Sequence, residues 1–511
     1  MIRSRTVVLA WAAAASAAAS ALAAEPARPA AAARPAVPVK AGQRPNILFI
    51  MSDDHAQHAL SCYGSKVNET PHLDRLASGG MRFDRAFVTN SICTPSRATL
   101  LTGQYSHLNG VPVFNRFDGS RQTVAKLLQA AGYHTVMIGK WHLGSDPTGF
   151  DHWIILPGQG AYVNPGFLTP KGPVMFEGHC TQITTDLGLK ALDERPKDKP
   201  FLMFLHHKAP HREWTPDEKN RAKFAGKVIP EPPTLRDDYA GRPAALPENK
   251  QTIVRDLNAR DLKGPPPEGL TGDDLLKWKY QRYMQDYLAC VAGVDDGVGQ
   301  VLDYLDKNGL AENTVVFYTA DNGFYLGDLG MYDKRFMYEP GLRVPLLVRW
   351  PGVTKAGSST ERFALNIDFA PTFLDIAGLP VPADMQGRPL TGLLRGEPPS
   401  DWRRSMYYRY YHDPGHHNTR AHLGVRTETH KLIHYWKKDA WELYDLVADP
   451  LEQKNLAADP AHKELLERMK AELARAKKEA RDDDQFAHEQ PGGGVDGPGP
   501  KAKKKAPAEK K

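Results

Sequence analysis

Two pairs of oxygen-bearing side chains each stand directly after an apolar run of strand length. Asp53 and Asp54 follow the first run, and Asp321 and Asn322 follow the second. In open α/β sheets, ligands bind just beyond the carboxyl ends of the strands, so the two pairs can converge on one hard cation. For either pair alone, an ordinary turn is the better explanation, because Asp and Asn are common turn residues. Taken jointly, the pairs favour a metal site.

A lysine and several histidines extend this chemistry. Lys140 and His142 are two residues apart in "IGKWHLG", so in an extended strand both side chains point to the same face. Such a pair suits an anionic substrate and a proton transfer near neutral pH, although it also fits an exposed strand face. The segment "HHKAPH" ends at His211 and could hold a transition metal, but the oxygen-rich pairs make that the lesser interpretation. We expect His211 at a pocket wall.

One of the four cysteines, Cys93, begins the stretch "CTPSRATLLTG", which ends at Gly103 and contains a short apolar, helix-like run. A cysteine in an apolar run is usually a small core residue. Residue types alone therefore leave Cys93 open between a packing role and a chemical one.

The elements that must position these residues alternate between two periodicities. Apolar runs predict buried strands, and segments with apolar residues at helical spacing lie between them. A helix is expected to begin at Pro71, with Thr70 as its N-cap and Gly79 as its stop. The predicted strands lie near residues 46–52, 82–88, 134–143, 199–207, 313–320 and 343–352, and further helices near 123–132 and 285–309. This alternation predicts an α/β fold with a large central mixed sheet flanked by helices on both faces.

A second, smaller unit follows. With 511 residues, 41% of them hydrophobic, the chain can bury a large core and divide into two packed units. Residues 215–275 are polar and proline-rich and predict a long surface excursion. We expect a catalytic domain at residues 45–395 and a C-terminal α+β subdomain at 396–486, with antiparallel strands and a closing helix at 462–483. Residues 487–511 predict a disordered basic tail.

The first 24 residues have the pattern of an export signal. Arg3 and Arg5 precede an alanine-rich apolar run and then small residues. A membrane anchor is the alternative, but alanine is only weakly apolar, which favours cleavage. Residues 25–44 are Pro- and Ala-rich and predict a linker. No later segment approaches the ~18 apolar residues of a second span, so we expect an exported protein, periplasmic or secreted, without a stable membrane span.

The net charge limits the possible binding partners, and the number of cysteines limits the possible disulfides. The formal net charge is +6, and the final stretch "KAKKKAPAEKK" contributes most of it, which argues against nucleic acid as a partner. Export permits disulfides, but if Cys93 has another role, only Cys62, Cys180 and Cys290 remain, so at most one pair can form.

The stretch from Cys93 to Gly103 resembles the signature of the type I sulfatases, without departure. The resemblance extends from Asn46 to about Asn455, with matching motifs in the expected order. It implies the alkaline-phosphatase-like sulfatase fold and oxidation of Cys93 to Cα-formylglycine by the formylglycine-generating machinery of the host.

The resemblance also implies a role for each matched residue. Calcium ligands would be Asp53, Asp54, Asp321, Asn322 and the modified Cys93. Arg97 would hold the formylglycine hydroxylate, while Lys140, His142, His211 and Lys334 would surround the sulfate. One hydroxyl of the aldehyde hydrate would attack sulfur, and the other would expel sulfate and restore the aldehyde. By this analogy, His211 would protonate the leaving alcohol and His142 would assist the formylglycine hydroxyl.

Within the family, segments such as "GKWHLGSDPTGFDHWIILPGQGAYVNP" and "HHKAPHREW" are most similar to the N-acetylglucosamine-6-sulfatases. The resemblance implies a sulfated carbohydrate as substrate, with 6-O-sulfate on N-acetylglucosamine in mucin-type or glycosaminoglycan chains. Aromatic and histidine density then suggests a sugar-binding wall in the smaller unit, with Tyr411, His412, His416 and His417 as candidates. A half-buried aromatic sheet with surface histidines explains the same pattern equally well.

Three other functions remain open. One is a sulfatase of another specificity, for an aryl or another sugar sulfate. The second is phosphoester or phosphonate hydrolysis, which the same fold and a similar metal site support. The third is a non-catalytic glycan-binding protein in which Cys93 is never modified. The full match around Cys93 and Arg97 favours sulfate ester hydrolysis.

Overall fold

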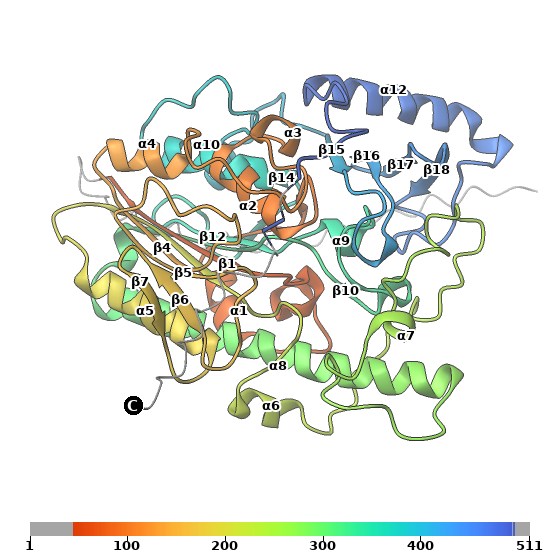
Figure 1. Ribbon diagram of the computed structural model, residues 1–511. Coiled ribbons are helices and arrows are strands. Elements are labelled where there is room, and N and C mark those ends of the chain that lie inside the picture. Colours follow the sequence, from red (N-terminus) through yellow and green to blue (C-terminus); the bar gives the residue numbers. More distant parts are fainter. Residues whose placement is uncertain (1–43, 493, 496–511) are drawn as a thin grey trace, which may run out of the picture. The chain divides into compact units, whose positions relative to one another are not determined.

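The computed structural model describes residues 44–492, 494 and 495. The predicted export signal and the predicted linker up to residue 43 lie outside the described residues. A ten-stranded sheet forms the centre of the described chain (Figure 1). Its strands, in spatial order, are β13 (Ser358–Thr360), β2 (Met81–Phe83), β12 (Leu346–Arg349), β9 (Thr314–Ala320), β1 (Asn46–Ser52), β8 (Phe201–His207), β4 (His134–Lys140), β5 (His152–Leu156), β6 (Gly166–Thr169) and β7 (Gly172–Met175).

The sheet is mixed, as predicted. Its middle strands β9, β1, β8, β4 and β5 run parallel. Antiparallel pairs border them, because β12 runs opposite to β9 and β6 runs opposite to β5. Parallel strands need covered faces, and their apolar runs are therefore continuous rather than alternating. All seven residues of β1 are buried.

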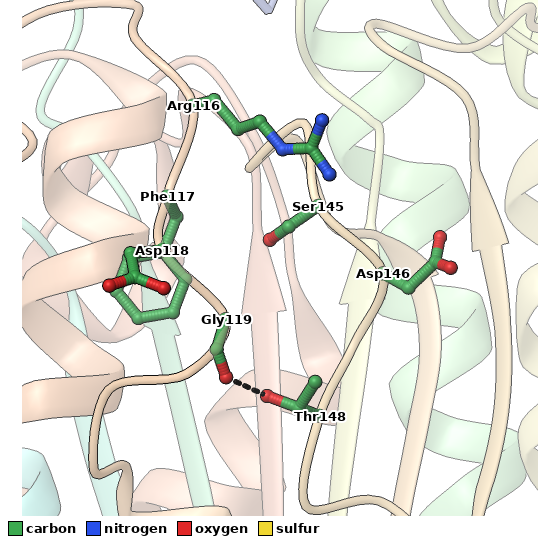
Figure 2. A pocket seen from close by; sticks show the side chains of 7 residues that line it. All are labelled: Arg116, Phe117, Asp118, Gly119, Ser145, Asp146 and Thr148. Atoms are coloured by element: carbon green, nitrogen blue, oxygen red, sulfur yellow. Dashed lines mark hydrogen bonds between the residues drawn. The ribbon is translucent and has the colours of Figure 1, made fainter.

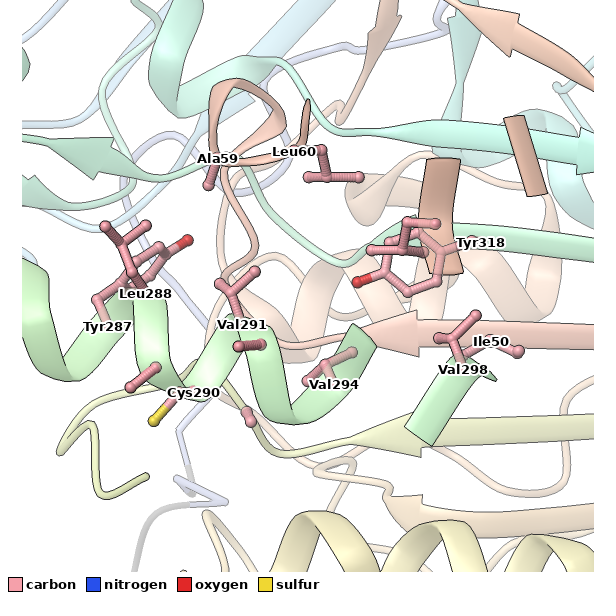
Figure 3. Packing of buried hydrophobic residues seen from close by; sticks show 14 of the residues in the cluster. Ile50, Ala59, Leu60, Tyr287, Leu288, Cys290, Val291, Val294, Val298 and Tyr318 are labelled. Atoms are coloured by element: carbon pink, nitrogen blue, oxygen red, sulfur yellow. The ribbon is translucent and has the colours of Figure 1, made fainter. Parts of the chain in front are cut away.

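Side chains of β1 divide between two apolar cores. Leu48 and Ile50 pack in one core, and Ile47 and Phe49 pack in the other. Successive residues of a strand point to opposite faces, so one short run supplies both cores. In Figure 3, Ile50 of the strand lies beside Val298 of the long helix that covers the first face.

Helices cover both faces, which confirms the predicted architecture (Figure 1). The first core includes side chains of α1 (Pro71–Ser78), α5 (Cys180–Glu194) and α8 (Gly272–Lys307). The second includes side chains of α2 (Cys93–Thr102), α4 (Val124–Ala130) and α10 (Phe369–Ile376). Short helices are α3 (Ser106–Asn109), α6 (Glu218–Phe224), α7 (Ile253–Asp256), α9 (Glu339–Leu342) and α11 (Thr391–Leu394).

Local signals placed some helix ends well and others poorly. Helix α1 begins at Pro71 after the N-cap Thr70 and ends before Gly79, as predicted. Helix α8 begins at Gly272 rather than near residue 285. Its first turn, residues 272–275, is mostly exposed and polar, so it resembles the preceding excursion in composition although it belongs to the helix.

Smaller sheets complete the fold. The C-terminal sheet has four antiparallel strands, β15 (Ser405–Tyr410), β16 (His422–Thr427), β17 (His430–Tyr435) and β18 (Ala440–Asp445). Helix α12 (Lys463–Glu479) packs on it through Met469 and Leu473, so this part is α+β as predicted. Two-stranded pairs join β3 (Ala86–Phe87) with β14 (Ala364–Leu365) and β10 (Tyr325–Leu326) with β11 (Tyr332–Asp333).

Most of the predicted tail, residues 493 and 496–511, lies outside the described residues, and the structure describes only residues 487–492, 494 and 495 of it. Gly494 forms an antiparallel bridge with Asn115, and the Val495 N–H donates to the Phe114 carbonyl at 2.8 Å. Ordered contacts therefore extend past residue 487. Within residues 44–492, 494 and 495, no helix is both long and apolar enough to span a membrane. The cysteines Cys62, Cys93, Cys180 and Cys290 are all free.

Candidate active site

Strand register brings the two acidic pairs together. Strands β1 and β9 are parallel neighbours, with Ser52 opposite Ala320. Asp53 and Asp321 are the next residues of the two strands, so both leave the sheet at the same edge. Backbone bonds fix the junction, because Asp321 N donates to the Ser52 carbonyl at 3.1 Å and Asp54 N donates to Asp321 Oδ1 at 3.1 Å. The predicted convergence at the carboxyl ends of the strands is therefore present.

The carboxylates of Asp53, Asp54 and Asp321 are buried, and one oxygen of each lies within 4.8 Å of the others. Asn322 faces the same cluster, since its Nδ2 donates to Asp54 Oδ1 at 3.2 Å. The Oδ1 atom of Asn322 is buried and has no hydrogen-bond partner among the described residues. Three carboxylates and a spare amide oxygen are the donors that a hard cation prefers, so these residues fit such an ion.

Cys93 is the first residue of α2, and its thiol lies inside the polar cluster. The Sγ atom is 3.5 Å from Asp53 Oδ1 and 3.3 Å from Lys334 Nζ. Burial and the neighbouring Asp53 carboxylate raise the pKa of the Cys93 thiol well above its usual range. Because only the thiolate is a good nucleophile, unmodified Cys93 is poorly suited to attack.

Arg97 lies one helical turn after Cys93, so both side chains point from the same face of α2. Its Nε donates to Asp321 Oδ2 at 2.9 Å, and its Nη2 donates to Asp53 Oδ2 at 2.8 Å. In a third hydrogen bond, Nη1 donates to the Lys140 carbonyl at 2.5 Å. The guanidinium thus connects the ends of three strands and is itself buried.

Two lysines add positive charge. Lys140 Nζ lies 2.5 Å from Asp53 Oδ2, and Lys334 Nζ lies 2.5 Å from Asp54 Oδ2. Burial would raise the pKa of Asp53, but Lys140, with the other nearby cations, holds it well below its usual range. Burial raises the pKa of Asp54 to about 7, and Lys334 opposes that rise. Together with Arg97, the lysines balance the three carboxylates in number.

Of the two predicted catalytic histidines, His211 contacts this cluster, and His142 is joined to the start of α2 through its backbone. His211 Nε2 lies 3.8 Å from Asp54 Oδ2, and Nδ1 is bonded to the Arg212 carbonyl. A carbonyl only accepts, so Nδ1 carries the hydrogen and Nε2 faces the cluster. His142 follows Lys140 by two residues, its carbonyl accepts from Thr94 Oγ1 at 2.9 Å, and its ring lies beside Phe114.

Five site residues other than glycine adopt left-handed backbone conformations. Their φ values are 64° at Asp54, 54° at His142, 70° at Asp333, 98° at Arg335 and 59° at His417. Such conformations are costly for residues with a Cβ and cluster at functional sites, where the surrounding structure enforces them. Because several such residues lie at this site, the backbone here is held in conformations that fix the directions of their side chains.

Of the four predicted sugar-contacting residues, three lie near the cluster. His417 places Nε2 3.0 Å from Asp333 Oδ2 and Nδ1 2.8 Å from Asp256 Oδ2. His416 stacks on Phe114, and His412 lies beside the same ring.

For the fourth residue, Tyr411, the prediction of a sugar contact is wrong. It is 1% exposed, with its hydroxyl bonded to His107 Nδ1 at 3.0 Å and its ring covered by Arg409. Tyr411 is a packing residue of this aromatic segment, so its side chain is not available to a sugar.

Sequence reasoning missed several residues around the cluster. Asp333 and Arg335 flank Lys334 and pair with each other at 2.6 Å. Gln159 Oε1 accepts from Lys140 Nζ at 2.7 Å, and Phe114 lies between His142 and His416. The charged triplet around Lys334 was a usable signal, whereas nothing local marks Gln159 or Phe114.

A separate cavity of about 480 Å³ lies between the segments that follow Phe114 and His142 (Figure 2). It is lined by Arg116, Phe117, Asp118, Gly119, Ser145, Asp146 and Thr148. No predicted catalytic or metal-binding residue lines it, so this cavity is distinct from the polar cluster.

Comparison with known proteins agrees with the geometry. Residues 45–379 match the family model Sulfatase, and residues 327–479 match the model N-sulphoglucosamine sulphohydrolase, C-terminal. An N-acetylglucosamine-6-O-sulfatase of Bacteroides thetaiotaomicron is 42% identical over 489 residues, covering 86% of this chain and 88% of that protein.

Solved structures share the fold. A protein in complex with its substrate D-glucosamine-2-N,6-O-disulfate has a TM-score of 0.85 at 42% identity, covering 88% of this chain and 100% of the other. A phosphonate monoester hydrolase of Agrobacterium radiobacter has a TM-score of 0.69 at 23% identity, covering 86% of this chain and 96% of the other, which indicates a common fold alone. Because the Sulfatase model spans both strand ends and α2, where the carboxylates and cations meet, the chain belongs to the sulfatase family and is a sulfuric ester hydrolase.

Proposed function

We propose that the enzyme removes 6-O-sulfate from N-acetylglucosamine in mucin-type or glycosaminoglycan chains. The observation that carries this proposal is the 42% identity to an N-acetylglucosamine-6-O-sulfatase over most of both chains. The buried cations agree with it, since a sulfate ester develops negative charge on the sulfuryl oxygens and on the leaving oxygen.

The proposed cofactors are Ca²⁺ at Asp53, Asp54, Asp321, Asn322 and modified Cys93, and Cα-formylglycine at Cys93. Calcium supplies positive charge, while formylglycine supplies a nucleophilic hydroxyl and a second hydroxyl for sulfate release. Three carboxylates already face three fixed cations, so a divalent ion leaves positive charge in excess. That excess favours an anionic ester in a site largely closed to water.

The remaining roles belong to side chains that are already in place. Lys140 and Lys334 hold the sulfuryl oxygens, and Arg97 orients the residue at position 93. His211 gives the leaving alcohol a proton from Nε2, and the ring enters this step with hydrogens on both nitrogens, because Nδ1 keeps its hydrogen on the Arg212 carbonyl. Burial, together with Lys140, lowers the pKa of His211 well below its usual range, which favours release of the Nε2 proton. His142 handles the proton of the attacking hydroxyl.

Sugar recognition falls to residues around Lys334 and His142. His417, clasped between Asp256 and Asp333, and His416, on Phe114, form the sugar-facing side together with His412. The 45–395 unit carries catalysis, and the 396–486 unit supplies these histidines. The export signal at residues 1–24 directs the enzyme to the periplasm or outside the cell.

The first experiment is the mass of the tryptic peptide from Ala86 to Arg97, taken from protein made in its own host. We expect a species lighter than the cysteine form by the exchange of CH₂SH for an aldehyde, together with its hydrate. The same protein should release sulfate from N-acetylglucosamine 6-sulfate. Only intact cysteine, with sugar binding but no turnover, would support the glycan-binding alternative instead.

A further inference from the structure

One loop of the sheet contacts two of the site residues, Lys140 and His211. The segment of residues 157–165 connects β5 with β6. Gln159 of this loop accepts from Lys140 Nζ at 2.7 Å. Tyr162 of the same loop donates its hydroxyl hydrogen to the His211 carbonyl at 2.7 Å. The loop thus joins a residue at the end of β4 to a residue that follows β8.

Tyr162 is held firmly. It is 6% exposed, and its carbonyl accepts from Cys180 N at 2.7 Å, at the start of α5. Its ring stacks on His179, with centroids 5.7 Å apart. On the ring also lies the ammonium of Lys208, 4.7 Å from the centroid. A buried cation over an aromatic face is attracted by the ring quadrupole, so Lys208 braces the tyrosine.

The same short segment carries His211. Lys208 and His211 are tied by a backbone bond, because His211 N donates to the Lys208 carbonyl at 3.0 Å. Lys208 Nζ lies 3.5 Å from the Arg212 carbonyl, which also receives the Nδ1 hydrogen of His211. The direction of Nε2 is therefore set by the backbone at residues 211 and 212, and Tyr162 anchors that backbone from outside.

We infer that Tyr162, braced by Lys208, is a positioning residue for His211 in the breaking of the ester bond. The inference rests on the proposed function, in which His211 donates to the leaving alcohol. In that step the nucleophile at position 93 bonds to sulfur as the bond between sulfur and the leaving oxygen breaks, and the electron pair of the broken bond stays on the leaving oxygen. That oxygen takes the Nε2 proton of the doubly protonated His211 ring, which returns to the neutral form with its hydrogen on Nδ1. Tyr162 exchanges no proton and contacts no substrate.

This role predicts a dependence on the leaving group. A sugar alkoxide is strongly basic and requires the proton as it departs, whereas 4-nitrophenolate departs without one. A positioned proton donor contributes about 10²–10⁴-fold, and misplacing it forfeits part of that factor only where it is needed. A general weakening of the fold would instead slow both reactions alike.

The test compares Tyr162→Phe with the wild-type enzyme on N-acetylglucosamine 6-sulfate and on 4-nitrophenyl sulfate. We expect kcat on the sugar sulfate to fall roughly tenfold, a fraction of the proton donor's contribution, with KM little changed and kcat on the aryl sulfate nearly unchanged. Lys208→Met should show the same selective loss. Tyr280→Phe is the matched control, because its hydroxyl also donates to a backbone carbonyl, that of Pro230 at 2.6 Å, and it should alter neither reaction.

Each outcome has a distinct meaning. Equal losses on both substrates, or no loss on either, would overturn the inference while leaving the proposed function standing. If the wild-type enzyme hydrolyses another alkyl sulfate but not the sugar sulfate, that alkyl sulfate replaces the sugar sulfate in the comparison. Only the proposed substrate is then wrong. If the wild-type enzyme hydrolyses no sulfate ester although Cys93 has been converted to formylglycine, both the proposed function and the inference are wrong.

Discussion

The ring of His416 lies nearly parallel to the ring of Phe114, with centroids 5.1 Å apart and planes at 23°. Phe114 in turn borders His142, at 5.9 Å between centroids. One aromatic ring therefore separates a predicted catalytic histidine from a histidine of the C-terminal part. His416 is exposed while Phe114 is buried, so the stack presents an imidazole face to solvent beside the polar cluster.

Replacing the neighbouring pair His416 and His417 should change sugar preference more than chemistry. For the double alanine variant we expect kcat/KM on N-acetylglucosamine 6-sulfate to fall at least tenfold, because a ring contact and a hydrogen bond are each worth about 1 kcal/mol. Hydrolysis of 4-nitrophenyl sulfate, which has no sugar hydroxyls, should change less than about threefold. His434→Ala, which removes a stacked histidine on Trp441 in the same small sheet, is the control. Comparable losses on both substrates would contradict a sugar-facing role.

Removing a carboxylate of the cluster and removing a cation of the cluster should have different effects on calcium content and on kinetics. Asp321→Ala removes a carboxylate of the acidic group, so we expect calcium content and activity to be lost together. Lys334→Ala leaves the three carboxylates intact, so calcium should remain while KM for sulfate esters rises, by roughly tenfold or more. Calcium per chain by mass spectrometry and kinetics on an aryl sulfate measure both. Full calcium in the first variant, or unchanged kinetics in the second, would count against the assignment.

Metal removal should lower thermal stability. A ligand that binds only the folded state stabilises it by about 2.7 kcal/mol at a hundredfold excess over its Kd. Prolonged dialysis against a chelator should therefore lower the Tm by several degrees, and added Ca²⁺ should restore it. Asp321→Ala should be insensitive to both treatments. An unchanged Tm of the unmodified protein after verified calcium loss would speak against a structural contribution of the ion.

The acidic cluster could be predicted because its signal is local. Asp53 and Asp321 each follow a strand, and the parallel order of β1 and β9 aligns the two strand ends without further information. The fold class followed from the alternation of periods in the same way. Cys93 is different, since composition favoured a core residue and only the family resemblance indicated chemistry.

The partners of the site residues could not be predicted, because they come from distant parts of the chain. His417 meets Asp256, which lies in the long polar excursion, and His211 meets Tyr162 across the sheet. Such contacts depend on how loops of irregular conformation fold over the strand ends, and no sequence period encodes that. Tyr411 shows the converse error, because a buried packing tyrosine and a sugar-binding tyrosine have the same local surroundings in sequence.

A buried glutamate in the C-terminal sheet predicts a pH dependence of stability. Glu442 lies on β18 and accepts hydrogen bonds from Tyr338 at 2.6 Å and Tyr444 at 3.0 Å. Its other oxygen has no partner among the described residues. Burial raises the pKa of Glu442 to about 7, with the two tyrosine bonds and Arg242 opposing the rise.

Because the folded-state pKa lies above the unfolded value, the folded protein binds the extra proton between pH 4.5 and 7. Stability from this group is complete below pH 4.5 and falls as pH rises through 7, by roughly 3 kcal/mol in all. Glu442→Gln keeps the shape and cannot ionise, so it should match the unmodified protein near pH 4.5 and exceed its stability at pH 8. Urea unfolding at both pH values measures this, with the exposed Glu464→Gln as control. An equal or lower stability of Glu442→Gln at pH 8 would show that the carboxylate is compensated in the fold.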